Sequence, residues 1–393
     1  MATDTLNGAA VIVGAFEHPG RRLPGYTVPR VLREVVFGAL ADAGLSIDDV
    51  DGFFCDGSVP GYGPVDMIEY LGIQTRYAAS TEFGGATYIA HVGQAAAAIA
   101  AGKCRVAVIA LAGLPNQAGT GNAALAIDYG PATAFETNGF RGGYSPVADY
   151  ALVARRHMYE FGTTSEQLAE VKVAASQFAQ YNPDAFLTDV VTVEDVVSSP
   201  LVADPLHRLD CCVMTDGGGA LVVVHPDVAR ELARRGAVVR GHGEASKDSH
   251  RGDIDFTYTA NRRSARDAFA EAGISPQHVG YLGLYDSFTI TVLIALEDLG
   301  ICERGGAGRY VENAGLTGTD GRIPVNSDGG GLCNNHPGNR GGMTKVIEAV
   351  RQLRGEAAPP VQVPDLEFAA VSGTGFRLAA RHYSSTLVLE QFS

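Results

Sequence analysis

The amino-acid sequence predicts an α/β protein of two similar halves, folded into five layers in the order α-β-α-β-α. Apolar runs typical of strands alternate along the chain with stretches that carry apolar residues at helical spacing. The second half repeats the order of the first, and a glycine pair precedes a helix at an equivalent place in each, Gly84-Gly85 and Gly341-Gly342. Alternation predicts mostly parallel sheets covered by helices. Duplication predicts that two such sheets enclose a central layer of buried helices.

The first half is expected to comprise residues 1–235. Its predicted elements are a strand at Ala9–Phe16, a helix from Pro29 to Gly44, a strand at Val50–Cys55, a helix from Gly84-Gly85 to Gly102, and strands at Val106–Leu111 and Ala220–Val224, followed by a helix at Ala229–Arg235. The helix that ends at Gly102 consists almost entirely of small residues, so we expect it to be central and buried. Between about residues 113 and 205 the pattern loosens, which predicts a loop insertion over the core with helical patches near 150–161 and 166–181.

The second half is expected to comprise residues 236–393. Its predicted elements are strands at Val238–Gly241 and Gly280–Tyr285, helices at Arg263–Ala272 and Thr289–Leu299, a glycine-rich loop at Asp328–Gly342, a helix at Met343–Leu353, and closing strands at Glu367–Val371 and Thr386–Glu390. The glycine-rich loop opens a helix, as the shorter glycine turn does in the first half.

Composition excludes several classes of function. The net charge of −14, without a run of Lys or Arg, argues against a binder of duplex nucleic acid. No apolar run approaches the ~18–20 residues of a membrane span, and the first residues do not resemble a secretion signal. The six cysteines show no metal-ligand spacing, and a chain of this size does not need disulfides. We therefore expect a cytoplasmic protein with neither a membrane span nor a metal site.

Four segments carry motifs: Thr81–Thr87, Leu209–Gly218, Leu284–Thr289 and Asn326–Gly338. Together they resemble the thiolase superfamily, and within it the sterol-carrier and lipid-transfer branch. The most specific piece is the His336-Pro337-Gly338 turn after a loop rich in asparagine and glycine. The resemblance covers essentially the whole chain. It implies the five-layered thiolase fold, a substrate that carries coenzyme A, and a homodimer formed through the sheet of the first half.

Two departures from the thiolase pattern point to a different reaction. A thiolase carries a nucleophilic cysteine at the start of the first buried helix, where the helix dipole stabilises the thiolate. Here that turn reads Phe83-Gly84-Gly85-Ala86. A thiolase also has an acid/base cysteine in a C-terminal turn, which here reads Val371-Ser372-Gly373-Thr374-Gly375. Because both cysteines are missing, thiolytic transfer through an acyl-enzyme is not expected.

The remaining candidates for chemistry are Tyr285, His336 and Asn335. A tyrosine at position 285 makes the chain similar to thiolase-fold aldolases that cleave steroid side-chain acyl-CoA thioesters. Those enzymes have a second tyrosine in the glycine-rich loop, where this chain has Asn334-Asn335-His336. Retro-aldol cleavage of a β-hydroxyacyl-CoA needs a base, an enolate stabiliser and an acid, and no covalent nucleophile.

Acid and base strength assign provisional roles. Ionising a phenol of pKa ~10 at pH 7 costs roughly 4 kcal/mol, so we expect Tyr285 to donate or relay a proton. His336 suits the role of base or enolate stabiliser. Asn335 and backbone N–H groups near Gly373 are further candidate oxyanion donors. A buried tyrosine is also common in protein cores, and asparagines also serve tight turns. Asp286 and Asp328 are expected to orient loops.

Two other functions stay open at this point. One is acyl transfer by a non-standard residue, with Cys333 as a displaced nucleophile, and the other is a non-catalytic subunit that binds acyl-CoA or lipid. The resemblance also implies a small OB-fold partner with a zinc ribbon that holds the CoA end. The residues that contact CoA are not localised, because the sequence has no phosphate-binding glycine loop of a known type.

Overall fold

The nine main strands form one mixed sheet in the order β3-β2-β4-β7-β1-β8-β11-β10-β9. The structure is a computed structural model that describes residues 6–57, 59–117, 146–248, 253–338 and 340–392. The strands extend over β1 (Val11–Glu17), β2 (Gly52–Asp56), β3 (Tyr77–Thr81), β4 (Val106–Gly113), β7 (Gly217–Val224), β8 (Gly236–Lys247), β9 (Tyr281–Leu284), β10 (Phe368–Arg377) and β11 (Arg381–Phe392). Strand β1 pairs with both β7 and β8 and so connects the two parts of the sheet.

The prediction of mostly parallel sheets is wrong. In the described sheet, parallel pairing is confined to β2 with β3 and β4, and to β9 with β10. Strand β7 runs antiparallel to both β4 and β1, and β10 and β11 form a hairpin that closes after Arg377. A parallel crossover is expected where a single helix connects two neighbouring strands. Here β10 and β11 are joined by a turn, β1 and β7 are not consecutive in the chain, and the segment from β4 to β7 contains several helices. The two expected sheets are also continuous, through the antiparallel pair β1–β8.

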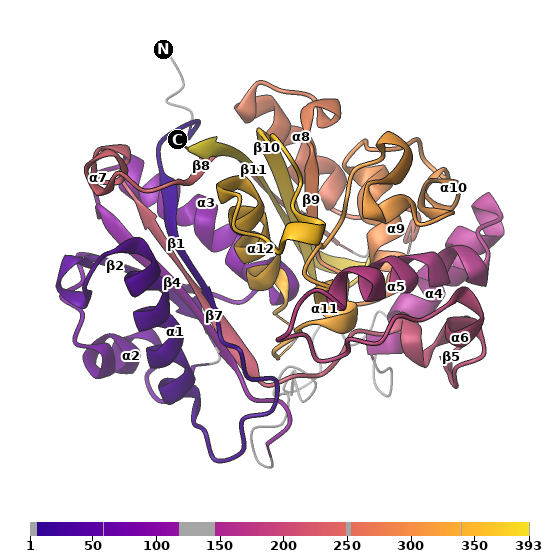
Figure 1. Ribbon diagram of the computed structural model, residues 1–393, viewed down its shortest axis with the longest axis horizontal. Helices are drawn as coiled ribbons and strands as arrows, with labels where there is room; N and C mark the ends of the chain where they lie inside the picture. The colour runs from indigo at the N-terminus through magenta and orange to yellow at the C-terminus, as the bar shows by residue number, and fades with distance from the viewer. Residues whose placement is uncertain (1–5, 58, 118–145, 249–252, 339, 393) are drawn as a thin grey trace.

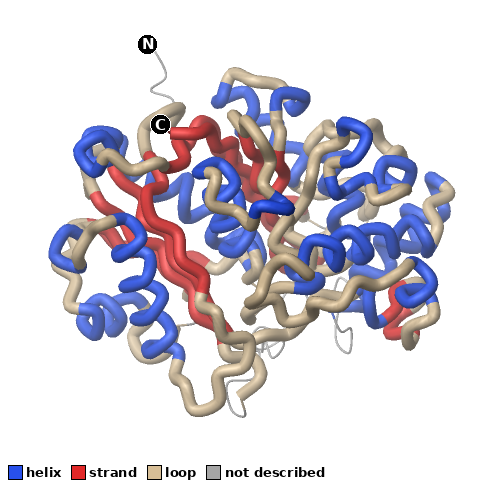
Figure 2. Tube along the Cα trace, viewed as in Figure 1, coloured by secondary structure: helices blue, strands red, loops and turns tan. Residues whose placement is uncertain are grey.

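The five predicted layers are present. On one outer side lie α1 (Val28–Ala43), α2 (Pro64–Leu71) and α7 (Pro226–Leu232), in the centre α3 (Thr87–Ala100) and α12 (Gly342–Arg354), and on the other outer side α8 (Asn261–Ala272), α9 (Thr289–Asp298), α4 (Pro146–Phe161) and α5 (Ser165–Ala179). Figure 1 shows α3 and α12 between the strands of the two parts of the sheet, and Figure 2 shows the same strands in red around these central helices. Three apolar clusters fill the spaces between the layers.

The central cluster explains why the sequence of α3 is made of small residues. Ile89 and Val92 of α3 pack with Ile347 of α12 and with Leu111 and Val371 from the two parts of the sheet. A helix that touches strands on two sides and a second helix beside it has little room for large side chains. The expectation of a central, buried helix at this position is therefore confirmed.

Helices α4 and α5 lie in the segment predicted as an insertion. Both contribute to the same apolar cluster as α9, through residues such as Tyr150, Leu168 and Leu293. Residues 118–145 of the predicted insertion lie outside the described residues. The sequence did not predict the short elements α2, β3, α6 (Val193–Val197), α10 (Ala307–Val311), α11 (Gly330–Cys333), β5 (Leu201–Ala203) and β6 (Leu206–His207), which lack a long apolar period.

Among the described residues, no helix combines the length and the apolar character that crossing a membrane requires.

Candidate active site

Tyr285 and His336 meet in the interior of the protein, although 51 positions separate them in the sequence. Tyr285 directly follows β9, where its backbone N–H donates to the carbonyl oxygen of Ser372 at 2.9 Å. His336 follows the short helix α11. The Tyr285 hydroxyl lies 2.9 Å from Nε2 of His336, and the side chains are only 5% and 2% exposed. The two aromatic residues that the sequence singled out thus form one hydrogen-bonded pair.

Glycines surround this pair because no other residue leaves enough room. A Cβ atom on Gly85 would lie 2.4 Å from Cζ of Tyr285, and one on Gly341 would lie 3.0 Å from Cδ2 of His336. Both distances are too short for ordinary contact between carbon atoms. Gly85 belongs to the turn in which a thiolase carries its nucleophile. In this protein the ring of Tyr285 fills the space into which a side chain at Gly85 would point.

Burial keeps both members of the pair neutral. It raises the pKa of the Tyr285 phenol well above the ordinary value of 10.0, and the nearby Asp286 carboxylate raises it further. It lowers the pKa of His336 to about 4, against a smaller opposing effect of Asp286. At neutral pH the site therefore holds an un-ionised phenol beside an un-ionised imidazole. Such a pair is able to accept a proton at one end and to pass another along the hydrogen bond.

Two aspartates hold the loop that leads to His336, as the sequence predicted. Asp286 accepts hydrogen bonds from the backbone N–H groups of Gly331 at 2.8 Å and Leu332 at 3.2 Å. It also forms a buried ion pair of 3.0 Å with Lys345 of α12. Asp328 accepts from the N–H of Gly330 at 2.9 Å. Both carboxylates therefore act on the start of α11, where unpaired N–H groups favour negative charge.

The side chain of Asn335 is engaged in two hydrogen bonds within the protein. Its Oδ1 accepts from the hydroxyl of Thr215 at 2.7 Å, and its Nδ2 donates to Oε1 of Glu17 at 2.8 Å. The neighbouring Asn334 donates to Asp328 at 2.8 Å and accepts from Arg21 at 2.7 Å. Asn335 directly precedes His336 in the chain. In the structure its side-chain amide is hydrogen-bonded to two distant segments, those of Glu17 and Thr215.

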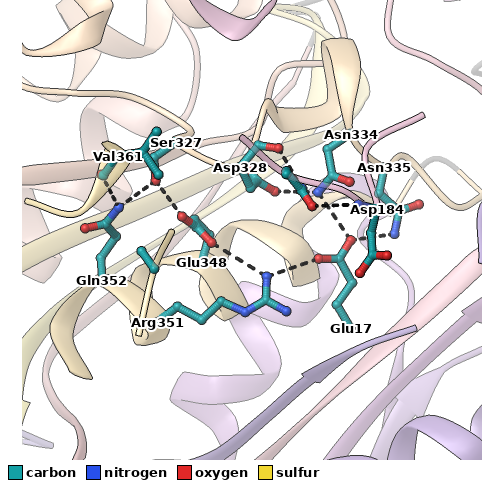
Figure 3. A network of polar contacts seen from close by, with 12 residues as sticks. Glu17, Asp184, Ser327, Asp328, Asn334, Asn335, Glu348, Arg351, Gln352 and Val361 are labelled. Atoms are coloured by element: carbon teal, nitrogen blue, oxygen red, sulfur yellow. Dashed lines mark hydrogen bonds and ion pairs between the residues drawn. The ribbon is translucent and has the colours of Figure 1, made fainter. Parts of the chain in front are cut away.

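A buried polar network connects this loop to helix α12 (Figure 3). Glu17 lies 3.5 Å from Arg351, which in turn lies 3.6 Å from Glu348. Glu348 accepts a hydrogen bond of 2.6 Å from Ser327 at the start of the loop. Burial raises the pKa of Glu348 to about 7. The sequence did not indicate Glu17 or Glu348, because a single acidic residue in a strand or a helix has no pattern that distinguishes it from a surface charge.

Cys333, the candidate for a displaced nucleophile, is fully buried. Lys172 donates to its sulfur at 3.0 Å and to the carbonyl oxygen of Leu332 at 2.8 Å. Burial raises the pKa of the thiol, although Lys172 acts in the opposite direction. A thiol that stays protonated and has no exposed surface is poorly suited to nucleophilic attack. Within the described part of the chain, no group of three or more His, Cys, Asp or Glu side chains is arranged to hold a metal ion.

The five layers, the glycine turns and a tyrosine–histidine pair without a nucleophilic cysteine define a thiolase-fold protein of modified chemistry. Comparison with known proteins agrees with this class. Residues 243–391 match the family model "Thiolase C-terminal domain-like". A steroid side-chain-cleaving aldolase from Thermomonospora curvata is 34% identical over 370 residues, which cover 89% of this chain and 91% of that protein. A 17-hydroxy-3-oxo-4-pregnene-20-carboxyl-CoA lyase from Mycobacterium tuberculosis is 34% identical over 373 residues, covering 91% and 94%.

The solved structure of an Ltp2-ChsH2(DUF35) aldolase superposes with a TM-score of 0.86 at 30% identity, covering 98% of this chain and 99% of that one. An acetyl-CoA acetyltransferase from Methanothermobacter thermautotrophicus is 41% identical over a shorter stretch, which covers 60% of this chain and 62% of that protein. The protein therefore belongs to the thiolase superfamily, in the branch that contains steroid side-chain-cleaving aldolases and sterol-carrier thiolase-like proteins.

Proposed function

We propose that the protein is a carbon–carbon lyase that cleaves a β-hydroxyacyl-CoA thioester by a retro-aldol reaction, without a cysteine nucleophile. The observation that carries this proposal is the neutral Tyr285–His336 pair, whose tyrosine ring lies next to Gly85, in the turn where a thiolase holds its nucleophile. Relatives of similar length named as an aldolase and as an acyl-CoA lyase support it. Because those relatives act on steroid side chains, we propose a steroid or a similarly bulky acyl group for this substrate.

In the proposed reaction the two side chains work as one proton relay. The β-hydroxyl of the substrate gives its proton to the Tyr285 oxygen while the tyrosine passes its own proton to Nε2 of His336. The bond between the α- and β-carbons breaks, the β-carbon becomes a ketone or aldehyde, and the electron pair moves into the thioester enolate. The same relay then returns the proton to the α-carbon, so that the only products are a carbonyl compound and a shortened acyl-CoA. No tyrosinate forms, which avoids ionising a buried phenol of raised pKa.

Oxyanion stabilisation is the second requirement of this mechanism. We propose that backbone N–H groups near Gly373 face the thioester oxygen, because β10 there continues beyond the end of β9. We assign Asn335 to the same site, but in a supporting role, because its amide is already bonded to Thr215 and Glu17.

The assembly is part of the proposal. We propose that residues 1–235 and 236–393 are the duplicated halves and that two chains form a homodimer through the first part of the sheet. In favour of this, β3 is an edge strand with partly exposed side chains, and such an edge is available for pairing. The similar aldolase of known structure is named for two components, Ltp2 and ChsH2(DUF35). We propose a comparable small OB-fold, zinc-ribbon partner here, with coenzyme A as part of the substrate.

The direct test is turnover of 17-hydroxy-3-oxo-4-pregnene-20-carboxyl-CoA by the full chain, alone and with an added OB-fold, zinc-ribbon protein from the same organism. Liquid chromatography with mass spectrometry should detect a steroid ketone and a shortened acyl-CoA in equal amounts, without added free CoA. A product that appears only when free CoA is added would indicate acyl transfer instead. Absence of both products from this and from other β-hydroxyacyl-CoA substrates, with the partner present, would overturn the proposal.

A further inference from the structure

We infer that Glu17, Asn335 and Thr215 form a chain of positioning residues that holds His336 against Tyr285. The three side chains link the end of β1, the glycine-rich loop before α12 and the segment before β7. Oε1 of Glu17 accepts from Nδ2 of Asn335 at 2.8 Å, Oδ1 of Asn335 accepts from Thr215 Oγ1 at 2.7 Å, and Thr215 Oγ1 accepts from the backbone N–H of His336 at 2.8 Å. The catalytic consequence of this chain rests on the proposed function.

The chemistry of the groups sets the direction of every hydrogen bond in this chain. A carboxylate only accepts, so Glu17 turns the NH₂ group of Asn335 towards itself and leaves the amide oxygen facing Thr215. That oxygen only accepts, so the Thr215 hydroxyl must direct its hydrogen to it. The lone pairs of the hydroxyl then remain for the N–H of His336. Reversing one link would place two donors or two acceptors against each other, so the chain has a single satisfied arrangement.

The outer end of the chain is itself fixed. Glu17 is 7% exposed and forms an ion pair of 3.0 Å with Arg21, and its other oxygen lies 3.5 Å from Arg351. Arg21 also donates to the side chain of Asn334 at 2.7 Å, which secures the residue before Asn335 as well. Buried charges held by two partners do not change position easily, because each broken contact leaves a charge without compensation.

The inner end of the chain acts on the residue that matters for the reaction. Thr215 bonds the backbone of His336 and also forms a bridge with Pro337, so it holds both sides of the turn. The His336 ring must stay 2.9 Å from the Tyr285 hydroxyl for protons to pass between them. A displacement of about 1 Å by a distant change costs on the order of 10²-fold in rate. Glu17 and Thr215 thus act through His336 and not on the substrate.

The test compares two variants of one hydroxyl. Thr215→Val keeps the shape of the side chain but removes the hydroxyl, while Thr215→Ser retains it. We expect Thr215→Val to lower kcat on the order of 10²-fold with KM within about twofold, and Thr215→Ser to stay close to the unchanged protein. Thr259→Val is the matched control. It removes an equally buried hydroxyl, which donates to Asp298 at 2.7 Å and accepts from the backbone N–H of Asn261 at 3.1 Å. We expect it to lower the melting temperature without a loss of kcat.

A second readout is independent of turnover. In protein labelled with ¹³C at histidine Cε1, with His336 assigned through a His336→Asn variant, the His336 signal should not titrate between about pH 5 and 8, because the pKa of this residue is lowered to about 4. In Thr215→Val the ring gains water contact, and we expect its pKa to rise into that range. Glu17→Gln should also lower kcat and raise the pKa of His336. This variant is used in place of Thr215→Val if Thr215→Val does not fold.

Three results would overturn the inference. They are an unchanged kcat in Thr215→Val, a change of KM without a change of kcat in Thr215→Val, and a loss of kcat in Thr259→Val as large as that in Thr215→Val. If the unchanged protein cleaves none of the acyl-CoA substrates, the proposed function fails by itself. The titration then still decides the positioning role, because an unchanged His336 signal in both Thr215→Val and Glu17→Gln contradicts it.

Discussion

Tyr285 and Asp286 are adjacent in the sequence and each belongs to a buried pair, Tyr285 with His336 and Asp286 with Lys345, but the two pairs differ in charge. For Tyr285 and His336 burial shifts both pKa values towards the neutral forms. For Lys345 burial also disfavours the charge, yet the adjacent Asp286 outweighs it and the pKa of the ammonium is raised. A charge survives in this interior only where an opposite charge touches it. The site therefore combines a neutral pair suited to moving protons with a charged pair suited to holding the loop.

The largest expected effect comes from removing the neutral pair. His336→Ala and Tyr285→Phe should each lower kcat by about 10²–10⁴-fold, the usual contribution of a positioned acid or base. The measurement is the steady-state rate of ketone formation. Tyr159→Phe serves as the control, because Tyr159 is 83% exposed and should keep normal turnover. Unchanged turnover in both site variants would remove the pair from the mechanism.

Breaking the charged pair should act mainly on stability. Lys345→Met leaves Asp286 buried without its counter-charge, so we expect the free energy of unfolding to fall by about 3–5 kcal/mol. Urea denaturation followed by circular dichroism measures it. Arg266→Met removes a surface ion pair with Asp267, in which the arginine is 69% exposed, and should change stability by ~0–1 kcal/mol. Equal effects of the two substitutions would contradict the difference drawn between buried and exposed charge.

Adding one methyl group at Gly85 should disturb the neutral pair without removing it. The new Cβ would lie 2.4 Å from Cζ of Tyr285 and 2.5 Å from the carbonyl oxygen of Thr374. We expect Gly85→Ala to cost about 1–3 kcal/mol of stability through overpacking and to reduce kcat as Tyr285 moves. Gly57→Ala is the matched control, since a Cβ there meets its nearest atom at 3.8 Å. Normal turnover of Gly85→Ala would show that Tyr285 has more space than its contacts indicate.

A further expected effect concerns the dependence of stability on pH. The pKa of His336 is about 4 in the folded protein and about 6.5 in an unfolded chain. Between these values the unfolded chain binds more protons, so stability falls as the pH falls from 6.5 towards 4, by at most ~1.4 kcal/mol per pH unit for this group. His336→Asn should make that decline less steep, as measured by urea denaturation at several pH values. His91 and His242, whose pKa values are also lowered to about 4, remain as a background slope.

The pH dependence of activity in the unsubstituted protein should also reflect the lowered pKa of His336. Because His336 stays neutral well below pH 6.5, kcat/KM should decline only as the pH approaches about 4. Initial rates taken before acid inactivation measure this limb. A decline of kcat/KM centred near the ordinary histidine pKa of about 6.5 would contradict the conclusion that burial keeps His336 neutral.

The elements predicted from the sequence are those with a strong local pattern. The small-residue helix α3, the strands β4 and β7, and the glycine turns before α3 and α12 follow directly from the spacing of apolar residues and glycines. Tyr285 and His336 were also accessible as candidates, because Tyr285 stands in a family motif and His336 in a turn of Gly, Asn and Pro that packing explains poorly. Their role in catalysis stays a prediction. The absence of cysteine from these turns indicated the change in chemistry.

The tertiary structure decided which distant segments meet. The antiparallel pairing of β1 with β8 depends on strand edges that no local sequence pattern distinguishes. The hydrogen bonds of Asn335 to Glu17 and Thr215 span 318 and 120 positions. Hydrogen-bond partners at such separations are chosen by the fold and not by local propensity. The sequence alone thus singled out Tyr285 and His336 as candidates, while the fold determined that they meet, that they are neutral and which side chains hold their loop, because all three depend on burial and on contacts between remote parts of the chain.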